Sequence, residues 1–239
     1  NNEARLVIDG TVEGTLDISA MSQITPSDED LEFAYSSSTE DTSFQHVGLL
    51  DEIHVHKAAL SLSQITALKD LANRASTNNL YKGLVGYWKA ETTDFVDSSA
   101  YSNSSTLQGN GSPSVVTGKV GDALKFDTSG YHYEVSDPND VYDTPNAVSV
   151  ALWFRPETDY TSGSNYRFFL DRQKPDGENN DSWFIGLNSP NQIHFGTKGG
   201  NVTSTQSSWQ QGTWYHVVAT FEDTGTSQTG KIYIDGSLD

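Results

Sequence analysis

Short stretches in which apolar and polar residues alternate make up most of the chain, and clusters of Gly, Asn, Asp, Ser and Pro separate them. Such alternation is typical of antiparallel strands, because successive side chains of a strand point to opposite faces. The nearly continuous apolar run at 147–154 indicates a central strand. The pattern predicts strands at residues 5–8, 31–35, 49–56, 83–89, 123–126, 131–135, 147–154, 167–170, 182–187, 192–196, 214–221 and 231–234.

One segment has helical spacing instead. Ser61 and Gln64 fit a capping box, in which each side chain accepts a hydrogen bond from a backbone N–H at the start of a helix. Apolar residues then recur every three or four positions, and we expect the helix to end near Arg74. Many short strands with one short helix predict an all-β protein, an antiparallel β-sandwich of the jelly-roll type.

The composition narrows the classes of partner. The 239 residues include 14 Lys and Arg against 32 Asp and Glu, a formal net charge of −18, and no Cys. Without Cys there is no disulfide scaffold and no thiolate metal site. The negative charge makes nucleic acid and anionic membrane surfaces poor partners, and no apolar run approaches the ~18 residues of a membrane span. The charge suits an extracellular or cell-surface setting and bound cations.

Both ends of the chain carry a related pattern. A strand-like run follows Asn1–Glu3 directly, without a recognisable secretory leader, so we interpret the chain as a piece excised from a longer protein. The run Arg-Leu-Val-Ile-Asp-Gly-Thr-Val at 5–12 is similar to Lys-Ile-Tyr-Ile-Asp-Gly-Ser-Leu at 231–238. A repeat at this spacing indicates a repeating unit as long as a whole domain.

The order of several motifs resembles one known family, the laminin G-like branch of the concanavalin A-like lectin/glucanase superfamily. The segment at 48–61 resembles its closing motif, a Gly-x-Ile-Asp-Glu-Val strand that leads into a Ser-capped helix. Its opening and middle motifs resemble the segments at 83–91, 97–100, 118–127, 133–135, 148–154, 214–221 and 234–236. The resemblance implies a concanavalin A-like jelly roll similar to that of the pentraxins.

The motifs stand in rotated order, because the closing third precedes the opening two thirds. Two organisations follow. In the first, a C-terminal-type segment (5–76) and an N-terminal-type segment (83–239) form one domain over 1–239; in the second, they are parts of two tandem repeats. We favour the first, because residues up to 76 alone offer too few strands to form a core. The duplicated strand is then an extra edge strand or exchanges with a neighbouring copy.

The superfamily that the chain resembles also includes glycoside hydrolases, which need two carboxylates about 5–5.5 Å apart for a retaining mechanism. On a single strand this geometry requires a Glu-x-Asp-x-x-Glu pattern, which the chain lacks. Asp28, Asp30 and Glu32 alternate, but in a polar loop that enters a strand. We therefore predict that the protein is not an enzyme.

Calcium is the predicted cofactor, because it binds the carboxylate, amide and carbonyl oxygens in which the loops are rich. The resemblance implies a structural ion at Asp51, Glu91 and Asp97; alternatively, Asp51 bonds the backbone of a loop. The similarity to the pentraxins implies a second calcium ion, held by ligands from two acidic loops that converge. The alternative is that both loops are solvated turns. These ligands are Glu40, Asp41, Asp176 and Asn179.

Carbohydrate recognition usually adds an exposed aromatic ring. Trp209 stands in a polar segment and is the best candidate, followed by Trp183, Tyr160 and Tyr166. These features predict a non-catalytic, extracellular, calcium-dependent module that binds a glycan or glycoprotein, within an adhesin or a secreted polysaccharide-acting protein. The alternatives are a calcium-stiffened spacer repeat and a glycoside hydrolase.

Overall fold

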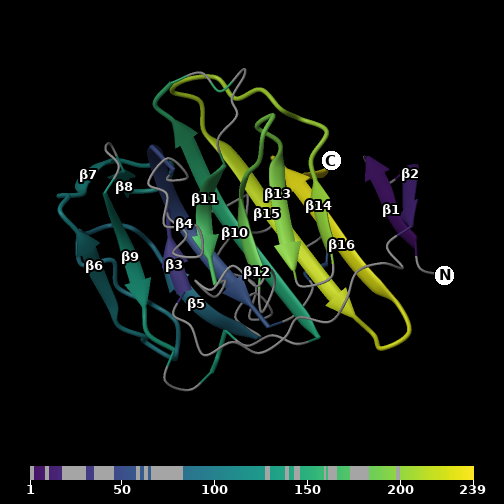
Figure 1. Ribbon diagram of the computed structural model, residues 1–239, viewed down its shortest axis with the longest axis horizontal. Coiled ribbons are helices and arrows are strands. Elements are labelled where there is room, and N and C mark those ends of the chain that lie inside the picture. Colours follow the sequence, from purple (N-terminus) through teal and green to yellow (C-terminus); the bar gives the residue numbers. More distant parts are fainter. Residues whose placement is uncertain are drawn as a thin grey trace.

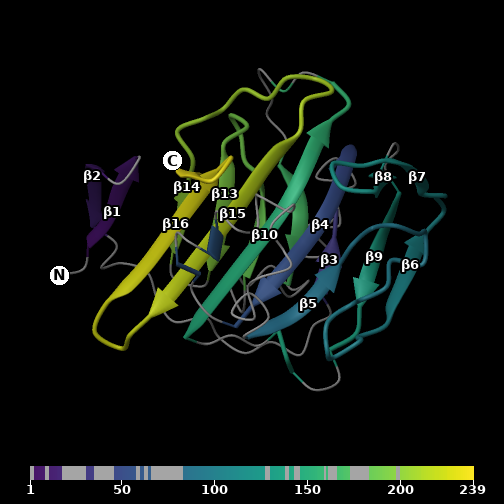
Figure 2. The same ribbon diagram turned by 180° about the vertical axis from the view of Figure 1, so that it is seen from behind.

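The computed structural model describes residues 3–8, 11–17, 31–34, 46–57, 60–61, 64–65, 83–126, 130–137, 140–142, 146–158, 160, 166–172, 183–197 and 200–239. Two large antiparallel sheets form a sandwich, and a two-stranded hairpin stands apart from it. Figures 1 and 2 show the two sheets from opposite sides, one behind the other. The part of the chain that the structure describes holds no helix with the length and apolar character needed to cross a membrane.

The first sheet has eight strands in the order β17-β16-β15-β10-β4-β8-β7, with β5 also paired to β4. The long strand β10 lies between β4 and β15, as expected for its continuous apolar run. The strands are β4 (Gly48–His56), β5 (Leu84–Trp88), β7 (Ser114–Thr117), β8 (Asp122–Phe126), β10 (Ala147–Pro156), β15 (Tyr215–Asp223), β16 (Gln228–Ile234) and β17 (Ser237–Leu238).

The second sheet has seven strands in the order β14-β13-β12-β11-β3-β9-β6. The strand β3 lies inside this sheet and pairs with β11 on one side and with β9 on the other. The strands are β3 (Leu31–Phe33), β6 (Ser105–Gly109), β9 (Tyr131–Val135), β11 (Arg167–Asp171), β12 (Trp183–Leu187), β13 (Ile193–Thr197) and β14 (Gly200–Thr203).

One apolar core fills the space between the two sheets. Both sheets contribute alternate residues, such as Leu31 and Phe33 of β3 and Ile53 and Val55 of β4, all fully buried. Aromatic rings dominate this core; the rings of Phe33 and Trp88 meet edge-on with centroids 4.7 Å apart. Edge-on contacts of this kind stabilise the fold by more than the apolar area they bury, so they help to fix how the two sheets pack on each other.

The early part of the chain supplies an interior strand to each sheet. β4 pairs with β10 along one edge and with β8 and β5 along the other. β3 lies between β9 and β11, which come from residues after 130. The two sheets therefore interleave strands from before residue 60 and after residue 83.

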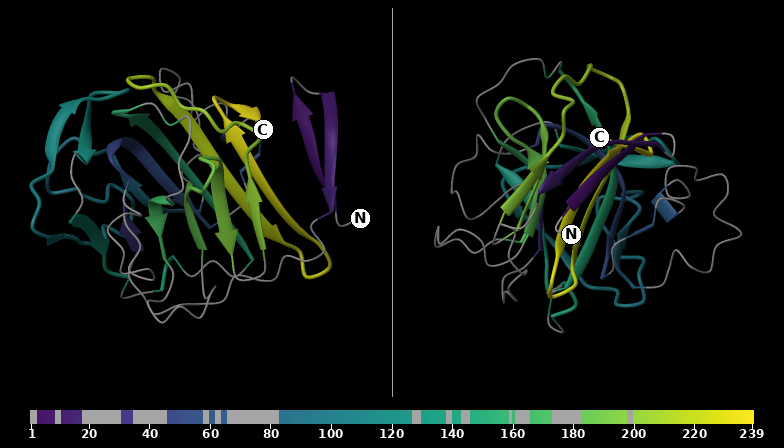
Figure 3. Two further views of the ribbon diagram at one scale, coloured as in Figure 1. Left: turned by 45° about the horizontal axis from the view of Figure 1, so that its top comes forward. Right: turned by 90° about the vertical axis from the view of Figure 1, so that its right-hand side faces the viewer.

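The hairpin β1 (Glu3–Ile8) and β2 (Thr11–Asp17) forms a sheet of its own. Figure 3 shows it next to β16 and β17, close to the C-terminal end, and β1 contacts both strands. Like β16 and β17, the two strands are joined through an Asp-Gly pair.

Each strand predicted from alternation is present, with ends that differ by a few residues. The expected helix is described only at its start. Ser61 N–H donates to Gln64 Oε1 at 2.9 Å, Gln64 N–H donates to Ser61 Oγ at 3.4 Å, and residues 64–65 are helical. The capping box is thus confirmed, and the predicted helix from 66 to 74 lies outside the described residues.

Candidate functional site

The outer face of the seven-stranded sheet carries a concentration of chemically active side chains. On β3, Leu31 and Phe33 point into the core, so Glu32 between them points outward. The same alternation places His132 and Glu134 of β9 on this face. We call the side chains of Glu32, His132 and Glu134 the Glu-His-Glu cluster.

Three carboxylates lie in a row across adjacent strands. Glu134 is the register partner of Glu32, and Glu32 is the register partner of Asp171 on β11. Neighbouring strands are about 4.8 Å apart, so the row brings three acidic side chains close together. Asp171 is fully buried and Glu32 is 5% exposed. Pairing between distant segments therefore concentrates negative charge at the middle of the face.

His132 contacts both glutamates of the cluster. Its Nε2 lies 3.4 Å from Glu134 Oε1 and 4.0 Å from Glu32 Oε1. Burial lowers the pKa of His132, while the hydrogen bond and the charge of Glu134 act in the opposite direction. Since the net shift is downward, the imidazole is mainly neutral at pH 7. Gln108 of β6 donates from Nε2 to the other oxygen of Glu134, Oε2, at 2.7 Å.

Aromatic rings occupy the neighbouring part of the same face. Phe184 contacts Phe168 edge-on at 5.3 Å between ring centroids and His194 at 4.9 Å. Tyr166 completes this aromatic patch, 6.5 Å from Phe168, and is 38% exposed. Gly196 lies beneath the patch, since a Cβ there would stand 2.2 Å from the Phe184 ring. Aromatic rings and carboxylates therefore lie side by side on the outer face of this sheet.

An open cavity of about 590 Å³ lies at the β6 edge of the sandwich. Thr106 lines it, and Thr106 is also the register partner of Glu134. The cavity is therefore next to the Glu-His-Glu cluster. Five of its eight lining residues carry a hydroxyl group; the lining consists of Thr93, Asp94, Ser105, Thr106, Leu107, Ser112, Pro113 and Tyr133.

Asp51 and Glu91, predicted as calcium ligands, instead bond one tight turn. Asp51 Oδ2 accepts from the backbone N–H groups of Lys119 and Val120 at 2.9 and 3.1 Å. Glu91 Oε2 accepts from the N–H of Asp122 at 3.2 Å. Gly121 has a φ of +62°, and a Cβ there would stand 2.5 Å from Glu91 Oε1, so the turn requires glycine. Burial raises the pKa of Asp51 to about 7, which its backbone hydrogen bonds partly oppose.

Asp97, the third predicted ligand, is surrounded by donors of the chain itself. Its Oδ1 accepts from the N–H groups of Tyr87 and Ser99, and its Oδ2 accepts from the Ser99 hydroxyl and the Asn103 N–H. Hydrogen atoms occupy the directions from which a cation approaches, so this donor set does not fit calcium. Among the described residues, Asp51, Glu91 and Asp97 form no common group of ligand atoms; the Glu-His-Glu cluster does.

We expect Asp97→Ala to lower the free energy of unfolding by about 3 kcal/mol, because it leaves buried N–H groups without acceptors. The loss should be the same with calcium and with EDTA. Asp94→Ala, which removes an exposed carboxylate three residues away, is the control and should change the free energy by less than about 0.5 kcal/mol. Urea unfolding measures both variants; a loss confined to calcium-containing buffer would restore Asp97 as a ligand.

The four residues of the second predicted calcium site, Glu40, Asp41, Asp176 and Asn179, lie outside the described residues. The proximity of these acidic loops therefore stays a prediction.

The predicted exposure of three aromatic rings is wrong. Trp209 and Trp183 are fully buried in the core, and Tyr160 is 4% exposed. The indole N–H of Trp209 donates to Asn191 O at 2.7 Å, so a polar group inside the protein satisfies the ring. Of the four candidate rings, Tyr166 is the one that solvent reaches. The aromatic patch on the outer face has this ring at its margin.

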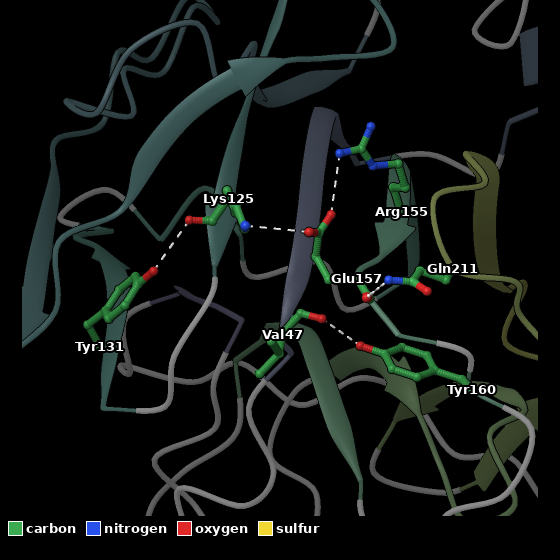
Figure 4. A network of polar contacts seen from close by, with 7 residues as sticks. All are labelled: Val47, Lys125, Tyr131, Arg155, Glu157, Tyr160 and Gln211. Carbon is green, nitrogen blue, oxygen red and sulfur yellow. Dashed lines mark hydrogen bonds and ion pairs between the residues drawn. The ribbon is translucent and has the colours of Figure 1, made fainter.

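Tyr160 is held inside the protein by a polar network near the start of β4 (Figure 4). Its hydroxyl donates to Val47 O at 2.6 Å. Nearby, Glu157 pairs with Lys125 of β8 at 3.4 Å and with Arg155 of β10 at 3.3 Å. Gln211 Nε2 donates to the Glu157 backbone oxygen, and Tyr131 donates its hydroxyl to Lys125 O. The network joins neighbouring strands and has a structural role.

Residues 127–239 match the model of a laminin G family, described as the concanavalin A-like lectin/glucanases superfamily. The match confirms the resemblance noted in the sequence over residues 127–239, and the motifs before residue 127 lie outside the matched range. The fold class is confirmed too, because two antiparallel sheets form a sandwich. Neither the curated proteins nor the solved structures contain a match to the chain.

Proposed function

We propose that this chain, whose residues 127–239 match the superfamily named above, is a non-catalytic extracellular module that binds a glycan with the help of calcium. It would serve as a recognition unit of a surface adhesin or of a secreted polysaccharide-acting protein. The observation that carries the proposal is the outer face of the seven-stranded sheet, where an aromatic patch adjoins a row of carboxylates.

The combination of aromatic rings and carboxylates on one face suits the binding of a sugar ring. The C–H groups on one face of a sugar pack against aromatic rings, and Tyr166 with Phe168 supplies such a surface. Sugar hydroxyls donate to carboxylates in charge-assisted hydrogen bonds, for which Glu134 is the most exposed acid of the row. Hydroxyl pairs of a sugar also complete the coordination of calcium. The calcium part of the proposal rests on the acidic loops that contain Glu40 and Asp176.

A glycan array, probed with the purified chain in calcium and again in EDTA, tests this function. We expect binding to at least one glycan class in calcium and its loss in EDTA. Tyr166→Ala should weaken that binding about 10-fold, the equivalent of one aromatic contact of about 1.4 kcal/mol. Tyr101→Ala is the matched control, since Tyr101 is an exposed tyrosine outside the patch.

Three outcomes count against parts of the proposal. Equal binding by Tyr166→Ala and the parent chain would remove the aromatic patch as the site. Binding that persists in EDTA would remove calcium. A folded chain that binds no glycan would leave the spacer repeat, calcium-stiffened, as the better explanation.

Glycan cleavage is a second candidate, and one observation favours it. Glu32 and Glu134 come from different strands, and the cluster brings their carboxylate oxygens within 4.8 Å of each other. This is close to the 5–5.5 Å between the two carboxyl groups of retaining glycosidases. Release of reducing sugar from β-glucans, lost in Glu134→Gln, would establish cleavage and contradict the non-catalytic proposal.

A further inference from the structure

We propose that the Glu-His-Glu cluster binds a divalent transition-metal ion, and that zinc fits its donors best. Glu32 and Glu134 each offer a carboxylate oxygen and His132 offers Nε2, all within 4.8 Å of one another. The site involves none of the residues predicted as calcium ligands. The inference concerns metal binding alone and holds whether or not a glycan binds.

The spacing of the donor atoms is close to that of a zinc site. Tetrahedral zinc with bonds of about 2.0–2.1 Å separates its ligand atoms by about 3.3 Å. His132 Nε2 and Glu134 Oε1 are 3.4 Å apart, so these two atoms already have the required separation. The separation of 4.0 Å between His132 Nε2 and Glu32 Oε1 must shorten by several tenths of an ångström, which side-chain rotation achieves.

The protein holds these donors on a rigid support. Glu32 and Glu134 are direct register partners on paired antiparallel strands, and both strands have another strand on their far side. The hydrogen bond from Gln108 to Glu134 Oε2 leaves Oε1 of Glu134 directed at His132. Partners that orient a ligand in this way typically change metal affinity by about 10–100-fold. Gln108 thus acts as a positioning residue for the site.

The donor types favour zinc over calcium. Calcium takes six to eight oxygen ligands, whereas imidazole nitrogen is a ligand for zinc and other late first-row ions. Two carboxylates and one imidazole give three protein ligands, the number found in zinc sites that keep a fourth position for water or another molecule. The adjacent carboxylate of Asp171 adds negative charge beside the site. We expect zinc to bind with 1:1 stoichiometry.

The test uses the full chain, stripped of metal with EDTA and then dialysed. Isothermal titration with ZnCl2 measures affinity, and titration with CoCl2 reports the coordination through visible absorption bands. We expect one ion per chain, a cobalt spectrum of tetrahedral type, and a weakening of zinc binding of at least about 100-fold in His132→Gln. Glu134→Gln, a near-isosteric change of a partly exposed residue, should weaken binding similarly.

Two control variants separate this site from general effects of charge and histidine. Glu222→Gln removes one exposed carboxylate on β15, and His194→Gln removes an imidazole from the same face outside the cluster. Both should keep the zinc affinity of the parent chain, with folding verified by circular dichroism. The proposal is overturned if the folded parent chain binds no zinc. It is also overturned if folded Glu134→Gln or His132→Gln binds zinc as tightly as the parent, or if calcium displaces zinc at equal concentration.

Discussion

A fragment of residues 83–239 should fail to fold on its own, because it lacks an interior strand of each sheet. β3 and β4 contribute six fully buried apolar side chains, namely Leu31, Phe33, Leu49, Leu50, Ile53 and Val55. At about 1.5–3 kcal/mol each, their burial contributes about 10–20 kcal/mol. This matches or exceeds the net stability of a typical domain, about 5–15 kcal/mol.

The expectation follows from our proposal that segments 5–76 and 83–239 form one jelly roll. Fragment 1–82 added to fragment 83–239 should restore β circular dichroism and a cooperative urea transition. A chain of residues 18–239 is the matched control; it loses only β1 and β2, which form their own sheet, and it should fold. Cooperative unfolding of 83–239 alone would instead favour two tandem repeats as the source of the two segments.

Acid should destabilise the protein strongly through two buried histidines. Burial lowers the pKa of His46 to about 3, with the charge of Arg167 acting in the same direction. Burial and the charge of His54 lower the pKa of His56 to about 3. The ordinary value, 6.5, applies in the unfolded chain, so below pH 6.5 the unfolded state takes up protons that the folded state cannot. Stability is therefore lost as the pH falls from 6.5 toward 3.

A difference of one unit between the pKa values of a group in the folded and unfolded states corresponds to about 1.4 kcal/mol of stability, which sets the size of this effect. Between pH 6 and pH 4 the two histidines together should lower the free energy of unfolding by about 5 kcal/mol. Asp51 acts oppositely, because its raised pKa makes the folded state bind a proton more tightly over part of this range. The comparison between the parent chain and a double variant isolates the contribution of the histidines.

Urea unfolding at pH 6, 5 and 4 measures the effect. The double variant His46→Gln, His56→Gln should lose about 5 kcal/mol less than the parent over this range. Each single variant should recover about half of that difference, and Glu222→Gln should follow the parent. If the double variant and the parent have the same pH dependence, the two imidazoles are protonated in the folded state.

The strands predicted from the sequence have a regular apolar pattern, which alternates where one face is buried and is nearly continuous where both faces are buried, as in β10. In β9, Tyr131, Tyr133 and Val135 are buried and the residues between them are not, so the alternation is visible in the sequence. β6 and β7 were missed because every residue of both is exposed or half-buried, which leaves no apolar period. β14 (Gly-Asn-Val-Thr) and β17 (Ser-Leu) each contain one large apolar residue, and a single residue cannot show a period.

The candidate site depends on strand register, which a single sequence does not reveal. Glu32 and Glu134 are about a hundred positions apart, and only the pairing of β3 with β9 brings them together. Their local signal was weak: each is an acidic residue between apolar neighbours. The wrong prediction that the ring of Trp209 is exposed has a similar cause. Polar neighbours suggested that Trp209 is exposed, yet its indole finds a backbone acceptor, Asn191 O, inside the protein.

The hairpin β1–β2 has a consequence for how the sequence tolerates change. The place beside β15 is taken by the chain's own β16, so the similar strand β1 is surplus to the sandwich. Substitutions in the hairpin should then leave the thermal stability of the sandwich nearly unchanged. We therefore expect the sequences of β1 and β2 to tolerate change more readily than those of the strands in the two large sheets.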